Sequence, residues 1–206
     1  MASRAAHAAD RRRQILDAAV RVFARQGFHT CRVSDIADEA GVAYGLVYHY
    51  FQSKEQVLDT LFLERWDVLL EAIAHVDNRR GAARDKLYAV TGFIVDSYRH
   101  DPELMKVIIV EVTRAANSFG RLHLEKIREA YEGIAHILED NSFKSGIPSE
   151  FAAMFFYGAI EQLLTGWIFE VMPRTEQDFE RSKELVVDTI CGGLQPARAD
   201  APAVSG

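Results

Sequence analysis

Residues 33–56, "VSDIADEAGVAYGLVYHYFQSKEQ", constrain the fold of this chain more strongly than its other stretches. Two short helical patterns flank the tripeptide "GVA". Two helices that meet at a tight angle need a small residue where they touch and a residue that tolerates positive φ where the chain turns, and Ala37 and Gly41 meet these needs. The apolar positions of one shared core fall at matching offsets: Ile36, Ala40, Val42, Val47 and Phe51. The spacing predicts a helix-turn-helix.

The second of these helices carries more aromatic side chains than a core can use. Val47 and Phe51 are four residues apart and share its buried face. The remaining side chains lie on the outward face or at its edge: Tyr44, Gly45, Tyr48, His49 and Tyr50. Phenol hydroxyls reach phosphates and rings contact thymine methyls, so a DNA major groove explains this face. Lys54 adds a positive charge beside the free N–H groups that open the next helix, which favours a phosphate.

Each of these residues also has a structural interpretation. Tyr48 or Tyr50 would fill a gap between helices, as aromatic side chains often do. His49 and Lys54 would be ordinary solvated side chains. Gly45 would be a tolerated glycine early in a helix.

Apolar residues recur at helical spacing along the rest of the chain, and no alternating β pattern of useful length occurs. We therefore expect an all-α fold with about nine helices. Ser53 and Gln56 form a capping box at the start of the helix that runs from Lys54 to about Val76. We expect a disordered tail at 1–9, a DNA-binding domain at 10–53 opened by Asp10, a helical ligand-binding and dimerisation domain at 54–194, and a disordered tail at 195–206.

Charge and composition exclude several classes of protein. The net charge of −6 comes from +1 in residues 1–60 and −7 in residues 61–206, so a general polyanion binder is excluded and any DNA contact uses a small patch. The apolar stretch 151–169 is interrupted by Glu161 and Gln162, which favours a buried helix over a membrane span. No signal peptide is visible, and Cys31 and Cys191 have no metal or redox spacing. We expect a cytoplasmic protein without metal or cofactor, and no enzyme motif is present.

Residues 11–62 resemble the DNA-binding domain of the TetR family of bacterial repressors. The resemblance lies in "ILDAAVRVFARQGF", in "VSDIADEAGVAYGLVYHYFQSKEQVLDTLF" and in their spacing. It implies a palindromic double-stranded operator. It also implies DNA contacts at Ser34, Ala43, Tyr44, Gly45, Tyr48, His49, Tyr50 and Lys54. By this resemblance Val33 to Ala40 is the positioning helix and Ala43 to Tyr50 is the recognition helix. Position 43 is often Ser or Thr in the family, and alanine can neither cap the recognition helix nor donate to a phosphate.

The region after residue 54 is a ligand-binding and dimerisation domain in that family. Small residues spaced seven apart in 149–171, and a second apolar stripe in 176–193, favour a homodimer built from these two helices of each chain. The expected interface residues are Ala152, Phe156, Ala159, Leu163, Gly166, Val186 and Ile190.

The stretches "VIIVEVTRAANSF" and "FYGAIEQLLTGWIF" resemble segments of the FadR-type branch of the family. That resemblance implies a long-chain fatty acyl-CoA as the effector, with aromatic and aliphatic walls and a cation for the CoA phosphates. The candidate residues are Phe93, Tyr98, Met105, Ile109, Arg114, Asn117, Tyr131, Phe155, Tyr157, Glu161 and Trp167. Arg99, Lys106 and Arg121 are further candidates for the phosphates, and packed core or solvated charge is the structural alternative.

Three other functions remain open from the sequence. The first is an activator of transcription. The second is a regulator that responds to another hydrophobic or aromatic ligand. The third is a helical ligand-binding module that no longer binds DNA.

Overall fold

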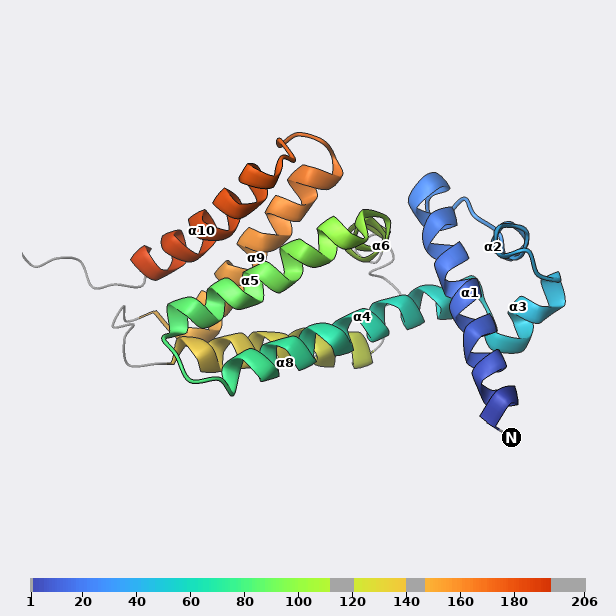
Figure 1. Cartoon of the computed structure of the whole chain (residues 1–206), viewed down its shortest axis with the longest axis horizontal. Coiled ribbons are helices and arrows are strands. Elements are labelled where there is room, and N and C mark those ends of the chain that lie inside the picture. Colours follow the sequence, from blue (N-terminus) through green and yellow to red (C-terminus); the bar gives the residue numbers. More distant parts are fainter. Residues whose placement is uncertain (1, 112–120, 140–146, 194–206) are drawn as a thin grey trace, which may run out of the picture. The chain divides into compact units, whose positions relative to one another are not determined.

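The computed structural model describes residues 2–111, 121–139 and 147–193 (Figure 1). Within these ranges there is no strand, so the predicted all-α class is confirmed. The elements are α1 (Ala2–Gln26), α2 (Val33–Ala40), α3 (Tyr44–Tyr50), α4 (Lys54–Asp77), α5 (Ala83–His100), α6 (Pro102–Lys106), the π-helical turn η1 (Val107–Glu111), α8 (Arg121–Leu138), α9 (Ser149–Ile168) and α10 (Glu176–Gly193).

Helices α1 and α4 end and begin where the sequence carries a stop or a cap. Gly27 follows α1 with φ 81°, and Phe28 after it packs edge-on against Phe23, with ring centroids 5.5 Å apart. At the start of α4, the Ser53 hydroxyl accepts the Gln56 N–H at 3.2 Å. The Gln56 side chain reaches one residue further back than expected, to the N–H of Gln52 at 2.6 Å.

The start of α1 differs from our expectation. We expected residues 1–9 to be a disordered tail and Asp10 to cap the helix, but α1 begins at Ala2. Five of residues 2–9 are alanine, which has the highest helix propensity of all residues. A helix can therefore continue into this segment without an apolar face.

The chain divides into two compact units. The first comprises residues 1–69 and 96–127, and the second comprises residues 70–95 and 128–206. Unit 1 thus contains α1, α2, α3, α6 and η1 together with parts of α4, α5 and α8. From the sequence we expected all of these elements after α3 to belong to the ligand domain. The division at residue 53 stays a prediction about independent folding, and residues 195–206 lie outside the described ranges.

Unit 1 is held together around α1. Side chains on one face of α1 are fully buried, among them Ile15, Ala18, Val22 and Phe23. Lys106 of α6 donates from its ammonium to the carbonyl of Ala24 at 2.8 Å, where the last turn of α1 leaves carbonyls without helical partners. The same helix that supports the helix-turn-helix is therefore attached to α6.

Unit 2 pairs α9 with α10, which lie side by side (Figure 1). Trp167 of α9 packs edge-on against Phe179 of α10, with ring centroids 4.8 Å apart. α9 is long and apolar enough to cross a membrane by length and composition alone. It buries seven residues inside unit 2, among them Phe156, Ile160 and Trp167, as a packed core helix does.

Candidate nucleic-acid interface

The helix-turn-helix has most of the core that the sequence predicts, while Val42, also expected there, is only half-buried. Ile36, Ala37, Ala40, Val47 and Phe51 are all at most 4% exposed. Because α3 is only seven residues long, this shared core, rather than its own hydrogen bonds, must fix its position.

The turn between α2 and α3 depends on Gly41. Its φ is +64°, a left-handed conformation that glycine adopts without strain. The N–H of Val42 donates to the carbonyl of Ala37 at 3.0 Å, which closes the end of α2. Ala43 then precedes α3 in an extended conformation with no side-chain cap, as its methyl group requires. Ala43 contributes only backbone and a methyl group to this surface.

Two ion pairs fix α2 against α1. Arg21 donates to the Glu39 carboxylate at 2.7 Å, and Arg25 donates to its other oxygen at 3.1 Å. Hydrogen bonds from Arg21 and then Arg25 lower the pKa of Glu39. These groups are solvent-exposed, so each pair contributes modestly to stability but restrains the angle between the helices.

The outward face of α3 carries the aromatic rings in question. Tyr44 is 53% exposed and Tyr48 is 44% exposed, which argues against a core role for Tyr48. Their hydroxyls lie 3.2 Å apart and their rings meet edge-on with centroids 5.1 Å apart. The hydrogen bond to Tyr44 raises the pKa of Tyr48 further above its usual value, so this phenol keeps its proton at neutral pH. The pair therefore presents two exposed phenol hydroxyls that can form hydrogen bonds with a partner.

The other predicted contacts of α3 lie beside this pair. Gly45 and His49 are exposed, and Tyr50 is half-buried at the edge of the helix. His49 and Tyr50 stack edge-on with ring centroids 5.1 Å apart. A Cβ at Gly45 would meet no atom within 4 Å, so the protein itself does not require glycine there. Close approach of a partner is consistent with this choice.

A shallow groove of about 660 Å³ joins α3 to the loop before α2 and to the start of α4. It brings together Ser34, Tyr44, Tyr48 and Lys54, four of the residues that the resemblance selects. Ala43, Gly45, His49 and Tyr50 do not line it. The groove also contains His29, Thr30, Arg32 and Glu55, which the sequence reasoning missed. The polar run "HTCR" at residues 29–32, directly before α2, is the sequence signal for the first three of them.

Lys54 has a structural role that the sequence did not indicate. Its ammonium donates to the carbonyls of Phe28 at 2.8 Å, Cys31 at 3.0 Å and His29 at 3.3 Å. It also lies 4.6 Å from the centroid of the Phe28 ring. Lys54 therefore holds the loop between α1 and α2 in place, and its contact with a phosphate stays a prediction.

The candidate ligand residues are divided between the two units. In unit 1, Tyr98 and Met105 are buried and Ile109 is half-buried. In unit 2, Trp167 is fully buried and Phe93 is half-buried. Phe155, which we expected in a pocket wall, is 64% exposed on the surface of α9. Arg114 and Asn117 lie outside the described residues.

Tyr131, Tyr157 and Glu161 form a polar cluster inside unit 2. The rings of Tyr131 and Tyr157 meet edge-on with centroids 5.8 Å apart. Burial raises the pKa of Glu161 above its usual range. Burial, followed by the charge of Glu161, raises the pKa of both tyrosines. Two phenol hydroxyls and one carboxyl group, all with raised pKa values, thus lie together in unit 2.

The predicted dimer residues lie mostly in the interior of the single chain. Ala152, Phe156, Gly166 and Val186 are buried there, so they add little surface for a partner to contact, and their place in an interface stays a prediction. The small residues instead permit close packing inside unit 2, since a Cβ at Gly166 would lie 2.7 Å from the sulfur of Met172. Ala159, Leu163 and Ile190 are half-buried. The exposed apolar residues of this region are Phe151, Met154, Phe155, Phe169, Val171 and Leu185.

No group of three His, Cys, Asp or Glu side chains in the described ranges is placed to hold a metal ion. The outward face of α3 presents exposed hydroxyl, imidazole and backbone groups. The short helix that carries them packs against α2. A surface of this kind defines a helix-turn-helix DNA-binding regulator.

Comparisons with known proteins identify the family. A sequence model described as bacterial regulatory proteins of the tetR family matches residues 15–61. The fatty acid metabolism regulator protein of Bacillus subtilis (strain 168) is 31% identical over 189 residues, which cover 88% of this chain and 94% of that protein. The chain therefore belongs to the TetR family of bacterial transcriptional regulators.

Two solved structures extend this comparison. The fatty acid degradation regulator FadR from Bacillus halodurans superposes with a TM-score of 0.79 at 27% identity, covering 89% of this chain and 96% of that one. FadR from Bacillus subtilis in complex with stearoyl-CoA superposes with a TM-score of 0.71 at 27% identity, covering 88% and 98%. The similarity thus includes the helices beyond the DNA-binding part.

Proposed function

We propose that this protein is a homodimeric repressor of fatty-acid degradation genes that long-chain fatty acyl-CoA releases from a palindromic operator. The observation that carries the proposal is the similarity to two FadR proteins over about nine-tenths of the chain, one of them bound to stearoyl-CoA. It supports an acyl-CoA effector because the likeness extends through the helical region that follows the helix-turn-helix.

Exposed apolar side chains on α9 and on α10 support the homodimer. Phe151 and Phe155 lie one helical turn apart on α9, and Leu185 adds an exposed apolar side chain on α10. Large apolar side chains gathered on an otherwise polar surface are typical of a protein interface. Two copies of the recognition helix related by a twofold axis would read two half-sites of a palindrome.

Release by a ligand requires that DNA and ligand favour different conformations of the protein. α4 is continuous from Lys54 to Asp77, and it contributes residues to both units. Its first residue holds the loop before the positioning helix. A tilt of α4 would therefore shift α3, and a coupling of order 1–3 kcal/mol is typical of such linkage.

The test is a titration of the protein bound to its own upstream DNA with acyl-CoAs of graded chain length. Free CoA and a free fatty acid serve as controls. We expect release that increases with chain length and that requires both the acyl chain and the CoA group. Release by an unrelated hydrophobic molecule, with none by any acyl-CoA, would assign the protein another effector.

A further inference from the structure

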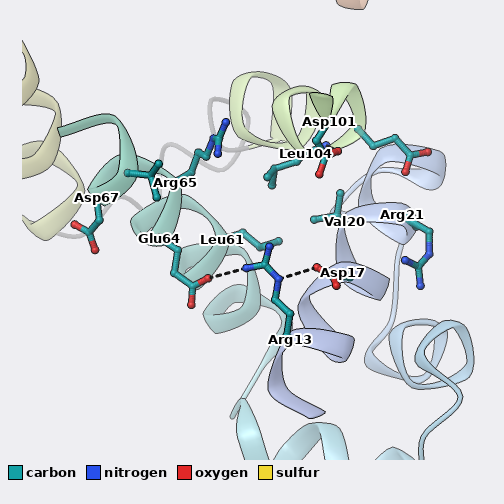
Figure 2. A pocket seen from close by; sticks show the side chains of 12 residues that line it. Arg13, Asp17, Val20, Arg21, Leu61, Glu64, Arg65, Asp67, Asp101 and Leu104 are labelled. Carbon is teal, nitrogen blue, oxygen red and sulfur yellow. Dashed lines mark hydrogen bonds and ion pairs between the residues drawn. The ribbon is translucent and has the colours of Figure 1, made fainter. Parts of the chain in front are cut away.

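A cavity of about 690 Å³ lies within unit 1, between α1, the first turns of α4, and α6 (Figure 2). This volume lies in the range of small-molecule sites. Val20 and Leu61 give the cavity a buried aliphatic wall, and Arg65 of α4 lines it too. The cavity therefore combines an apolar surface with a guanidinium group.

Three of the five acidic side chains that line the cavity already have ion-pair partners. Glu64 accepts from Arg12 at 2.6 Å. Asp17 pairs with Arg13 at 3.1 Å, and Figure 2 shows Arg13 lying between Asp17 and Glu64. Asp67 pairs with Lys126 of α8 at 2.8 Å.

The two remaining acids belong to the start of α6. Asp101 caps that helix by accepting the N–H of Leu104 at 2.9 Å. Glu103 is exposed in its first turn, where the helix dipole favours an anion. None of these carboxylates is positioned by a hydrogen bond to Arg65.

Arg65 is different from the other cations of this cavity. In the parts of the chain that the structure describes, its guanidinium makes no hydrogen bond and no ion pair, and Asp101 is the opposite charge that acts on it. In Figure 2 the side chain of Arg65 lies apart from the Arg13 ion pairs. A half-buried guanidinium has five N–H donors, and without a hydrogen-bond acceptor its lost hydration is offset only by the charge of Asp101.

We infer that this cavity binds the phosphate group of an organic phosphate ester, with Arg65 as its bidentate contact. The guanidinium fork matches two phosphate oxygens, and the aliphatic wall suits the uncharged body that carries the phosphate. The phosphate belongs either to the CoA part of the effector or to a separate phosphorylated metabolite. In both cases the site contacts α1, so its occupancy would bear on the helix that supports the helix-turn-helix. The inference goes beyond the proposed function and does not require acyl-CoA to be the effector.

The test is calorimetric titration of the full-length protein with three probes: CoA, dephospho-CoA and inorganic phosphate. Arg65→Met keeps the aliphatic stem and removes the donors, while Arg65→Lys keeps the charge and removes the fork. The matched control is Arg128→Met, since Arg128 is an exposed arginine of α8 paired with Glu132.

We expect CoA to bind the wild type and the Arg128 variant equally. Its affinity should fall by about tenfold or more in Arg65→Met and by less in Arg65→Lys, because a charge-assisted bidentate contact is lost or reduced. Dephospho-CoA binding as tightly as CoA would locate the contact at the diphosphate. Weaker binding of dephospho-CoA would locate it at the 3′-phosphate. Inorganic phosphate binding alone, dependent on Arg65, would favour the separate metabolite.

A thermal scan keeps the test decisive if a variant folds poorly. CoA should raise the melting temperature of the wild type more than that of Arg65→Met, while the unliganded variant should be at least as stable because a desolvated charge has been removed. Equal binding of all probes by wild type and Arg65→Met, or no binding of any probe by the wild type, would overturn the inference. If acyl-CoA releases DNA from Arg65→Met as it does from the wild type, the proposed function stands without this site. If CoA binding depends on Arg65 but acyl-CoA releases no DNA, the site stands without the proposed function.

Discussion

Helices α3 and α9 both expose aromatic rings, but the rings carry different atoms. On α3 they are the phenols of Tyr44 and Tyr48, whose hydroxyls meet at 3.2 Å. On α9 they are the hydrocarbon rings of Phe151 and Phe155. A hydroxyl group suits a partner rich in acceptors, such as a phosphate backbone, while a bare ring is stabilised only when another apolar surface covers it. On this basis we propose that α3 contacts DNA and that α9 contacts a second copy of the chain.

The largest effect is expected from removing the polar atoms of the α3 face. Tyr48→Ala combined with His49→Ala should cost several kcal/mol of operator affinity, at roughly 1–3 kcal/mol for each good contact. Both side chains are exposed, so the melting temperature and the dimer should be unchanged. Fluorescence anisotropy with labelled upstream DNA gives the affinity. Wild-type affinity in the double variant would mean that another surface reads the DNA.

A charge on the exposed face of α9 should instead weaken the dimer first and DNA binding as a consequence. Phe155→Glu places a charge in the proposed interface and should raise the dimer dissociation constant by about 100-fold, or roughly 3 kcal/mol. Operator affinity should fall with it, because two half-sites must be bound together. Sedimentation at graded concentrations measures the constant, and Leu122→Glu, at an exposed leucine of α8, is the control. A dimer that survives the charge at Phe155 would place the interface elsewhere.

A third variant separates the buried stripe of α9 from its exposed face. Gly166→Val should lower the free energy of unfolding by about 1–3 kcal/mol more than Gly92→Val, since overpacking affects only the first site. A Cβ at Gly92 meets no atom within 4 Å, whereas one at Gly166 collides with Met172. Chemical denaturation followed by circular dichroism gives both values. The dimer constant should not change, and a large change there would return Gly166 to the interface.

The smallest effect on DNA binding is expected at Lys54, which lies at the edge of the predicted DNA-contact surface. Lys54→Met removes three hydrogen bonds to carbonyls and should cost about 1–3 kcal/mol of stability. If the ammonium also contacts a phosphate, as we predict, the log–log salt slope of DNA binding should decrease by about one unit. Loss of stability with an unchanged slope would confine Lys54 to holding the loop.

The sequence was sufficient where a position has few chemical solutions. Gly41 in a left-handed turn, Val47 and Phe51 under α3, and Gly27 after α1 could be predicted because only glycine or a buried apolar residue fits such positions. The helix-turn-helix was therefore predictable at the level of single residues.

The sequence was insufficient where one pattern has two physical uses. Ala152, Ala159 and Gly166 form a small-residue stripe that permits close approach within one chain as well as between chains, and only the packing against Met172 distinguishes the two. Phe155 fits a pocket wall and an exposed interface equally well by spacing. The role of Lys54 depended on carbonyls about 25 residues away, which no local pattern reveals.

The most direct test of the account is the stoichiometry and symmetry of the complex between the wild-type protein and its own upstream DNA. Sedimentation and chemical footprinting at moderate salt measure both. The account predicts an even number of chains on each site and a symmetric footprint whose half-sites lie about 34–36 Å apart, or a multiple of that. A single chain with an asymmetric footprint, or binding that shows no preference over random DNA, would contradict it.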